Sequence, residues 1–79
     1  MYLKRIADLR EDNDLKQKDI AQFLKVNRST YSKWESGDNN IPLLKLDKLT
    51  VKYNVSFDYM FGLTKNKRIE NGVYSNMDL

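Results

Sequence analysis

The groups in this chain whose types and spacing could do chemistry are concentrated between Lys16 and Lys33. Five basic residues stand here against one acidic residue, with small hydroxyl side chains among them. Arg28 could bond bidentately to guanine, and Ser29 or Ser32 could reach either a base or a phosphate. A basic patch confined to one short segment is the electrostatic footprint expected of a nucleic-acid binder.

Catalytic and metal chemistry have little support. The chain contains no cysteine and no histidine, so the usual zinc ligand sets are absent. Its three glycines, Gly37, Gly62 and Gly72, lie too far apart for a phosphate-binding loop. Ser29 and Ser32 have no plausible base nearby. We therefore expect no enzymatic activity and no cofactor.

The elements that must position these side chains are two short helices joined by a tight turn. Ile20 and Leu24 give the first an apolar face, and the helical period restarts with Tyr31 and Trp34 after an interruption. Asn27 is a suitable N-cap for the second helix. Two helices joined by a turn of three or four residues form the helix-turn-helix unit.

This stretch resembles the helix-turn-helix of the phage-repressor and Cro-like DNA-binding family, also called the XRE family. The resemblance covers roughly residues 3 to 63, and two runs, SKWESG and VSFDYMFG, make it strong. The residues that carry it are Ile6, Leu9, Arg10, Gln17, Ile20, Ala21, Leu24, Val26, Arg28, Ser29, Thr30, Ser32 to Gly37, and Val55 to Gly62.

The expected fold is all-α: a five-helix repressor-like domain with a central helix-turn-helix. Residues 1–63 form the domain, and residues 64–79 form a C-terminal tail that is either a hairpin around the Asn71-Gly72 pair or disordered. The predicted core comprises Ile6, Leu9, Ile20, Leu24, Val26, Tyr31, Trp34, Leu46, Leu49, Val55, Phe57 and Met60.

Local signals set the expected helix ends. The first helix should cover Met1 to Asn13, and Gly37 should end the third. Pro42 suits the first position of a fourth helix, in which Leu43 joins the apolar period and which Asn54 ends with a left-handed cap. Ser56 should cap a short fifth helix.

Two residues depart from the family pattern. Lys16 stands where the second helix commonly has a Ser or Thr cap, which predicts either a frayed first turn or a lysine that faces phosphate. Lys25 stands where the turn usually has glycine, and a positive φ there would cost roughly 1 kcal/mol.

The third helix should lie in the major groove of DNA with its N-terminal residues at the base edges. The expected base contacts are Arg28, Ser29, Ser32 and Lys33. Thr30 is nearer the flank, where its methyl group could touch a thymine or simply pack. The resemblance implies that Gln17 bonds a phosphate. The full set of expected phosphate contacts is Lys16, Gln17, Lys18, Asn27, Thr30, Asn39 and Asn40.

Arg10 lies on or beside the apolar stripe of the first helix, and a buried arginine must be paired. The resemblance implies an ion pair between Arg10 and Glu35 that joins the first and third helices. The alternative is that both are solvated surface charges.

The family typically binds as a two-fold dimer, so we expect a homodimer on a palindromic operator. Tyr59, Phe61 and Leu63 are the candidate dimer contact, although they could instead close the core.

The predicted function is sequence-specific binding of double-stranded DNA by a cytoplasmic transcriptional regulator, as a repressor or autoregulator. Two alternatives stay open. The scaffold could serve an antitoxin or another protein-interaction module with a protein partner, or it could bind RNA or nucleic acid without sequence preference. No segment approaches the roughly 18 apolar residues that span a bilayer.

Overall fold

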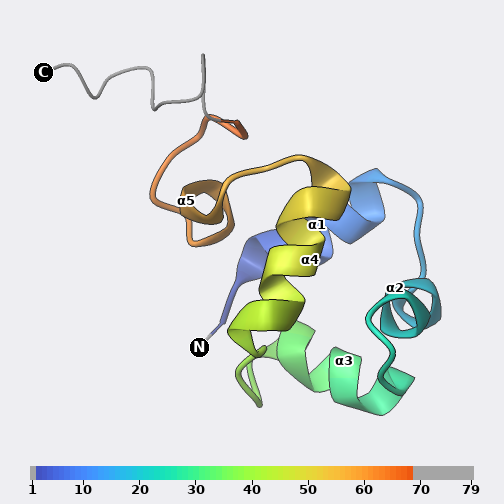
Figure 1. Cartoon of the computed structure of the whole chain (residues 1–79). Helices are drawn as coiled ribbons and strands as arrows, with labels where there is room; N and C mark the ends of the chain where they lie inside the picture. Colours follow the sequence, from blue (N-terminus) through green and yellow to red (C-terminus); the bar gives the residue numbers. More distant parts are fainter. Residues whose placement is uncertain (1, 69–79) are drawn as a thin grey trace, which may run out of the picture.

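The computed structural model describes residues 2–68, and in that part of the chain it contains five helices and no strand. The predicted all-α, five-helix architecture is confirmed. The helices are α1 (Lys4–Asp12), α2 (Gln17–Phe23), α3 (Arg28–Ser36), α4 (Leu43–Tyr53) and α5 (Phe57–Met60) (Figure 1).

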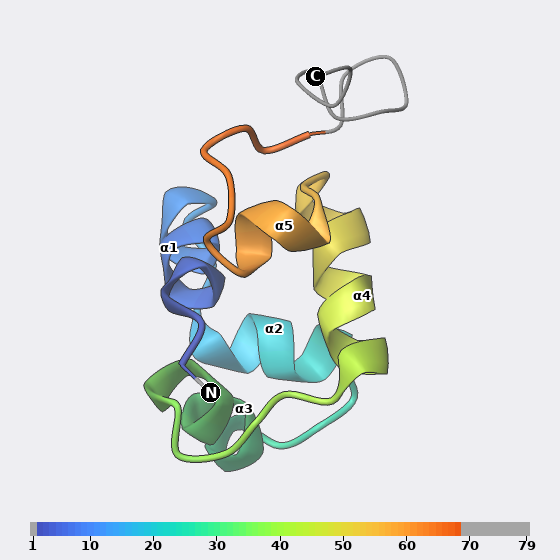
Figure 2. The same cartoon turned by 90° about the vertical axis from the view of Figure 1, so that its left-hand side faces the viewer.

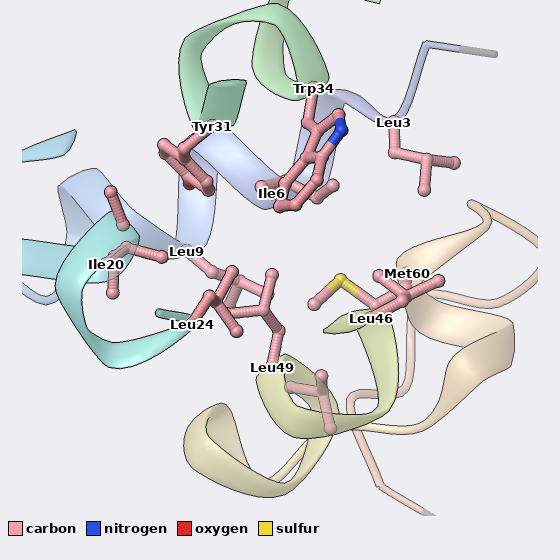
Figure 3. Close-up of a cluster of buried hydrophobic side chains, with 12 residues drawn as sticks. Leu3, Ile6, Leu9, Ile20, Leu24, Tyr31, Trp34, Leu46, Leu49 and Met60 are labelled. Carbon is pink, nitrogen blue, oxygen red and sulfur yellow. The ribbon is translucent and has the colours of Figure 1, made fainter. Parts of the chain in front are cut away.

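The helices surround a single core. In Figure 2, α1 and α4 form opposite sides of the domain, α5 covers one end, and α3 lies across the other end. Ile6, Ile20, Tyr31 and Leu49 are completely buried where these elements meet (Figure 3). Their burial supplies the apolar contact that such short helices need, because isolated helices of this length are marginal in water.

Most of the predicted core is buried. Val26 and Phe57 are only partly buried at its edge, whereas Leu3 and Ala21, which were not on the predicted list, lie inside it. Ala21 is buried in α2, the helix that packs most extensively on α3, where a small side chain permits close approach of the two helices.

The predicted helix caps are present. The Asn27 Oδ1 atom accepts a hydrogen bond from the backbone N–H of Thr30 at 2.9 Å, at the start of α3. Ser56 Oγ accepts from the Tyr59 N–H at 3.0 Å, at the start of α5. Asn54 ends α4 in the left-handed region with φ +58°. These local predictions are confirmed.

Both departures from the family pattern have a structural consequence. The Lys16 side chain is an ammonium and cannot accept a hydrogen bond, so the first turn of α2 is held by Asp19, whose Oδ2 atom accepts from the Lys16 N–H at 2.9 Å. Lys25 takes a left-handed conformation with φ +60°. The turn therefore keeps its usual shape at the cost of some backbone strain.

Three predictions about the helices need correction. The first helix begins at Lys4 rather than Met1 and ends at Asp12. Pro42 is extended and occupies the N-cap, so α4 begins one residue later than expected, at Leu43. Leu43 is 65% exposed, because it lies in the first turn of α4 and the core below is filled by residues such as Leu46.

The start of the predicted tail is bonded to the domain. Arg5 Nη1 donates to the Thr64 carbonyl at 2.6 Å, and the Ser56 N–H donates to the Lys67 carbonyl at 2.7 Å. The hairpin considered around Asn71-Gly72 lies outside the described residues.

Candidate nucleic-acid interface

One face of α3 is exposed to solvent, because the opposite face is buried in the core. Tyr31 and Trp34 are buried, and their rings meet edge to face with centroids 6.4 Å apart. The helical period then directs Arg28, Ser29 and Lys33 into solvent, with Ser32 half-buried between them. The four residues predicted to contact bases thus share the outer face of α3.

The first turn of α3 has a defined hydrogen-bonding pattern. Asn27 Oδ1 accepts from the Thr30 N–H and also from the Ser29 hydroxyl, at 3.0 Å. The N–H donors of the Asn27 side chain form no hydrogen bond with another described residue, so they could donate to a phosphate oxygen. The Ser29 oxygen keeps lone pairs and could accept from the amino group of a base. Thr30 is half-buried, as expected for a residue at the flank.

A groove of about 400 Å³ separates the starts of α2 and α3. Four of the five residues that line it are cationic, and the fifth carries an amide. A surface of this composition favours an anion. Arg10 is paired with the Glu35 carboxylate, whereas the other three cations form no ion pair among the described residues. The lining residues are Arg10, Lys16, Gln17, Lys18 and Arg28.

Beneath this groove, the Glu35 carboxylate joins three helices. Glu35 accepts from Arg10 Nε at 2.6 Å and Arg10 Nη2 at 3.2 Å on α1, and from Gln17 Nε2 at 3.0 Å on α2. It also accepts from the Tyr31 hydroxyl on its own helix at 2.5 Å. Arg10 Nη1 additionally donates to the Leu15 carbonyl. This network fixes α3 relative to α1 and α2.

The network also sets the charge of Glu35. Burial favours the neutral acid, but hydrogen bonds from Arg10, Tyr31 and Gln17 outweigh burial and lower the pKa of Glu35 below its usual value. Burial, together with the bond to Glu35, raises the pKa of Tyr31. Glu35 is therefore ionised and Tyr31 neutral at neutral pH.

Apart from Asn27 and Thr30 at the start of α3, the predicted phosphate contacts fall into two groups. Lys16, Gln17 and Lys18 lie together along the groove. Asn39 and Asn40 are exposed in the loop after α3, at the end of that helix away from the groove (Figure 1). The Asn39 N–H donates to the Lys33 carbonyl at 3.2 Å.

The residues predicted as a dimer contact differ in their surroundings. The Arg5 guanidinium lies 4.0 Å from the Tyr59 ring centroid, and Phe61 stacks on Phe57 at 6.4 Å. Phe61 is 36% exposed, whereas Leu63 is 74% exposed. Two of the three side chains therefore have partners within their own domain.

Two stabilising residues were missed from the sequence. Arg5 Nη1 bonds the carbonyls of Tyr59 and Thr64, and Lys45 Nζ bonds the Leu24 carbonyl at the end of α2, at 2.8 Å. Each side chain bonds a backbone carbonyl that is distant in the sequence. No local sequence pattern predicts such a contact.

Comparison with known proteins agrees with this geometry. Residues 6–60, more than half of the chain, match the helix-turn-helix family. The chain belongs to the phage-repressor and Cro-like helix-turn-helix family. This is a family of DNA-binding transcriptional regulators, not of enzymes.

Three curated relatives resemble this helix-turn-helix protein. The uncharacterized HTH-type transcriptional regulator YobD of Bacillus subtilis is 36% identical over 81% of this chain and 57% of its own length. The antitoxin PezA of Streptococcus pneumoniae is 31% identical over 82% of this chain and 41% of its own. The cryptic phage CTXphi transcriptional repressor RstR of Vibrio cholerae is 34% identical over 70% of this chain and 50% of its own length.

The chain thus spans about half the length of the curated relatives it matches. No solved structure matches it. Among residues 2–68, no helix has the length and apolar character needed to cross a membrane.

Proposed function

We propose that this helix-turn-helix protein binds double-stranded DNA sequence-specifically and represses transcription, including that of its own gene. In this proposal α3 enters the major groove. Arg28, Ser29, Ser32 and Lys33 read base edges there, and two copies bind the half-sites of a palindromic operator. In a bacterial host the protein would act in the cytoplasm, where the DNA lies.

The cationic groove beside α3 carries the proposal. A DNA backbone that follows this groove would meet Lys16, Gln17 and Lys18 at the start of α2, as α3 enters the adjacent major groove. Phosphate contacts fix register and orientation, and base contacts specify sequence. Arg28 lines the groove and also stands on the outer face of α3, so it lies where both kinds of contact meet.

The test begins with selection of binding sites from random duplex DNA. On the selected site, Arg28→Ala should weaken binding by about 1–3 kcal/mol and relax the preference at one position. Lys18→Ala should weaken binding to all sequences and reduce the slope of log K against log salt by about 1. Lys65→Ala removes an exposed charge far from the groove and is the matched control.

Two results would contradict the proposal. One is binding that falls steeply with salt and shows no sequence preference, which would indicate non-specific nucleic-acid binding. The other is equal loss of affinity with Arg28→Ala and Lys65→Ala.

The similarity to an antitoxin supports a second candidate, a module that binds a protein partner. A module of this kind has no need for Arg28 and Lys33 on the outer face of α3. If Arg28→Ala and Lys33→Ala both leave the protein's effect in the cell unchanged, that result supports the protein-binding function and contradicts the regulator function. In an antitoxin that also binds DNA, the same substitutions would leave binding to the protein partner intact but abolish binding to the operator.

A further inference from the structure

The outer face of α4 carries a stripe of apolar side chains that the domain core does not use. Leu44 is 79% exposed and Val51, two turns further on, is 73% exposed. The core-facing side of the same helix is formed by Leu46, Leu49 and Thr50. Two large exposed apolar side chains thus lie in line on the solvent face of one helix, where they would lose contact with water if a partner covered them.

Two charged residues flank this stripe symmetrically. With 3.6 residues per turn, Asp47 and Lys48 lie on opposite sides of the line through Leu44 and Val51, each about 50° from it. Both are exposed, and neither forms an ion pair with another residue of the described chain. We name the surface formed by Leu44, Asp47, Lys48 and Val51 the α4 stripe.

The pattern of the α4 stripe is complementary to itself in one orientation. If two α4 helices pair in parallel about a two-fold axis along their length, opposite flanks meet. Leu44 then meets its copy, Val51 meets its copy, and Asp47 faces Lys48 in both directions. Antiparallel pairing instead places each flank against its own copy, so that Asp47 faces Asp47 and Lys48 faces Lys48.

From this complementarity we infer that the α4 stripe is a self-association surface whose occupant is the α4 stripe of a second copy of this chain, paired in parallel. The inference rests on the proposed function for its biological use. It differs from the α5 region considered above, where Tyr59 and Phe61 already have partners in their own domain.

The orientation of α4 in the domain agrees with this pairing. Figures 1 and 2 both show α4 running from the end of the domain that carries α3 to the end that carries α5. A two-fold axis parallel to α4 keeps both copies of α3 at the same end, so both reading faces point the same way. One DNA duplex could then meet both copies, whereas antiparallel pairing would direct them to opposite sides.

The contact should be weak in the absence of DNA. Stable interfaces bury about 1,200 Å² or more, and four residues from each copy fall short of that. Two copies on adjacent half-sites have a high effective concentration, which would make the same contact contribute to binding.

The charged pair provides the test. Sedimentation equilibrium of the whole chain, from micromolar to millimolar concentration, measures the dimer dissociation constant without DNA. Asp47→Lys and Lys48→Asp each create two like-charge contacts across the two-fold axis and should raise that constant about tenfold. The double variant Asp47→Lys/Lys48→Asp exchanges the charges and should restore it. A purely intramolecular role predicts no such rescue.

Val51→Lys should raise the dissociation constant about 100-fold, because it buries an unpaired charge in the contact. Leu63→Lys tests the α5 region, which is the alternative dimer contact, and should leave the constant unchanged if the α4 stripe is the contact. A wild-type monomer at all concentrations, a dimer that survives Val51→Lys, or single charge variants that the double variant does not rescue would each overturn the inference. Circular dichroism checks that each variant is folded. Because the measurement omits DNA, its failure is distinguishable from a failure of the proposed function.

Discussion

Arg10 and Glu35 are 25 residues apart in the chain, yet Arg10 Nε lies 2.6 Å from Glu35 Oε2 inside the domain. Their side chains are only 12% and 8% exposed, so both charges are largely removed from water. The pair fastens α1 to the C-terminal turn of α3. The position of α3 therefore depends on a contact outside its outer face.

Removing one member of this pair should destabilise the domain more than removing both. Arg10→Met leaves Glu35 charged and buried, and should lower the free energy of unfolding by about 3–5 kcal/mol. Arg10→Met combined with Glu35→Leu should lower it by less, because no uncompensated charge remains. Urea unfolding of the two single variants and the double variant measures this. A loss in the double variant that equals the sum of the two single losses would mean that the two charges do not interact, as expected for solvated side chains.

Acid should destabilise the protein through Glu35. Its folded-state pKa lies below the ordinary value of 4.5, because hydrogen bonds from Arg10, Tyr31 and Gln17 outweigh its burial. The unfolded chain thus takes up the proton at higher pH, so this stabilisation is complete above pH 4.5 and is lost as pH falls through the folded-state pKa. Thermal melts from about pH 7 to about pH 3 should show a smaller decrease for Glu35→Gln than for the wild type.

Two tyrosines whose hydroxyl groups are buried should respond differently to loss of the hydroxyl. Tyr31 donates to Glu35, so Tyr31→Phe should lower the free energy of unfolding by about 1.5–3 kcal/mol. The Tyr53 hydroxyl is buried without a hydrogen-bond partner among the described residues, and burial raises the pKa of Tyr53 to about 12. Tyr53→Phe should be neutral or stabilising. Chemical denaturation of both variants measures these changes. A large loss of stability in Tyr53→Phe would mean that the Tyr53 hydroxyl has a hydrogen-bond partner.

Relief of strain in the turn should stabilise the domain. Lys25 has φ +60°, which glycine adopts without steric cost. Lys25→Gly should raise the free energy of unfolding by up to about 1 kcal/mol. Gln22→Gly, three residues earlier at an exposed position within α2, should lower it by about the same amount. If Lys25→Gly also destabilises the protein, the left-handed conformation is not strained.

Much of the fold could be predicted because its signals are local. A cap such as Asn27 or Ser56 bonds a backbone N–H three residues away, so its meaning is contained in one turn of sequence. A left-handed residue such as Gly37 or Asn54 ends a helix regardless of what packs around it. The exposure of Leu43 was not predictable in this way, because the helical period permits either outcome at the first turn of a helix.

The candidate site was predictable only in part. The period of α3 placed Arg28 and Lys33 on its outer face once Tyr31 and Trp34 were assigned to the core. The family resemblance implied a contact between Arg10 and Glu35. Only the structure showed that Gln17 and Tyr31 also donate hydrogen bonds to the Glu35 carboxylate. The groove between the starts of α2 and α3 also required the packed domain, because its lining comes from three helices.

The sequence by itself determined the helix count, the caps at Asn27 and Ser56, the left-handed ends at Gly37 and Asn54, and the inward face of α3. These features depend on hydrogen bonds and side-chain periods that span a few residues. Tertiary structure alone decided which carbonyls Arg5 and Lys45 bond, what surrounds Glu35, and which apolar residues of α4 remain exposed. Each of these depends on how helices pack, and packing brings together residues that are distant in the chain.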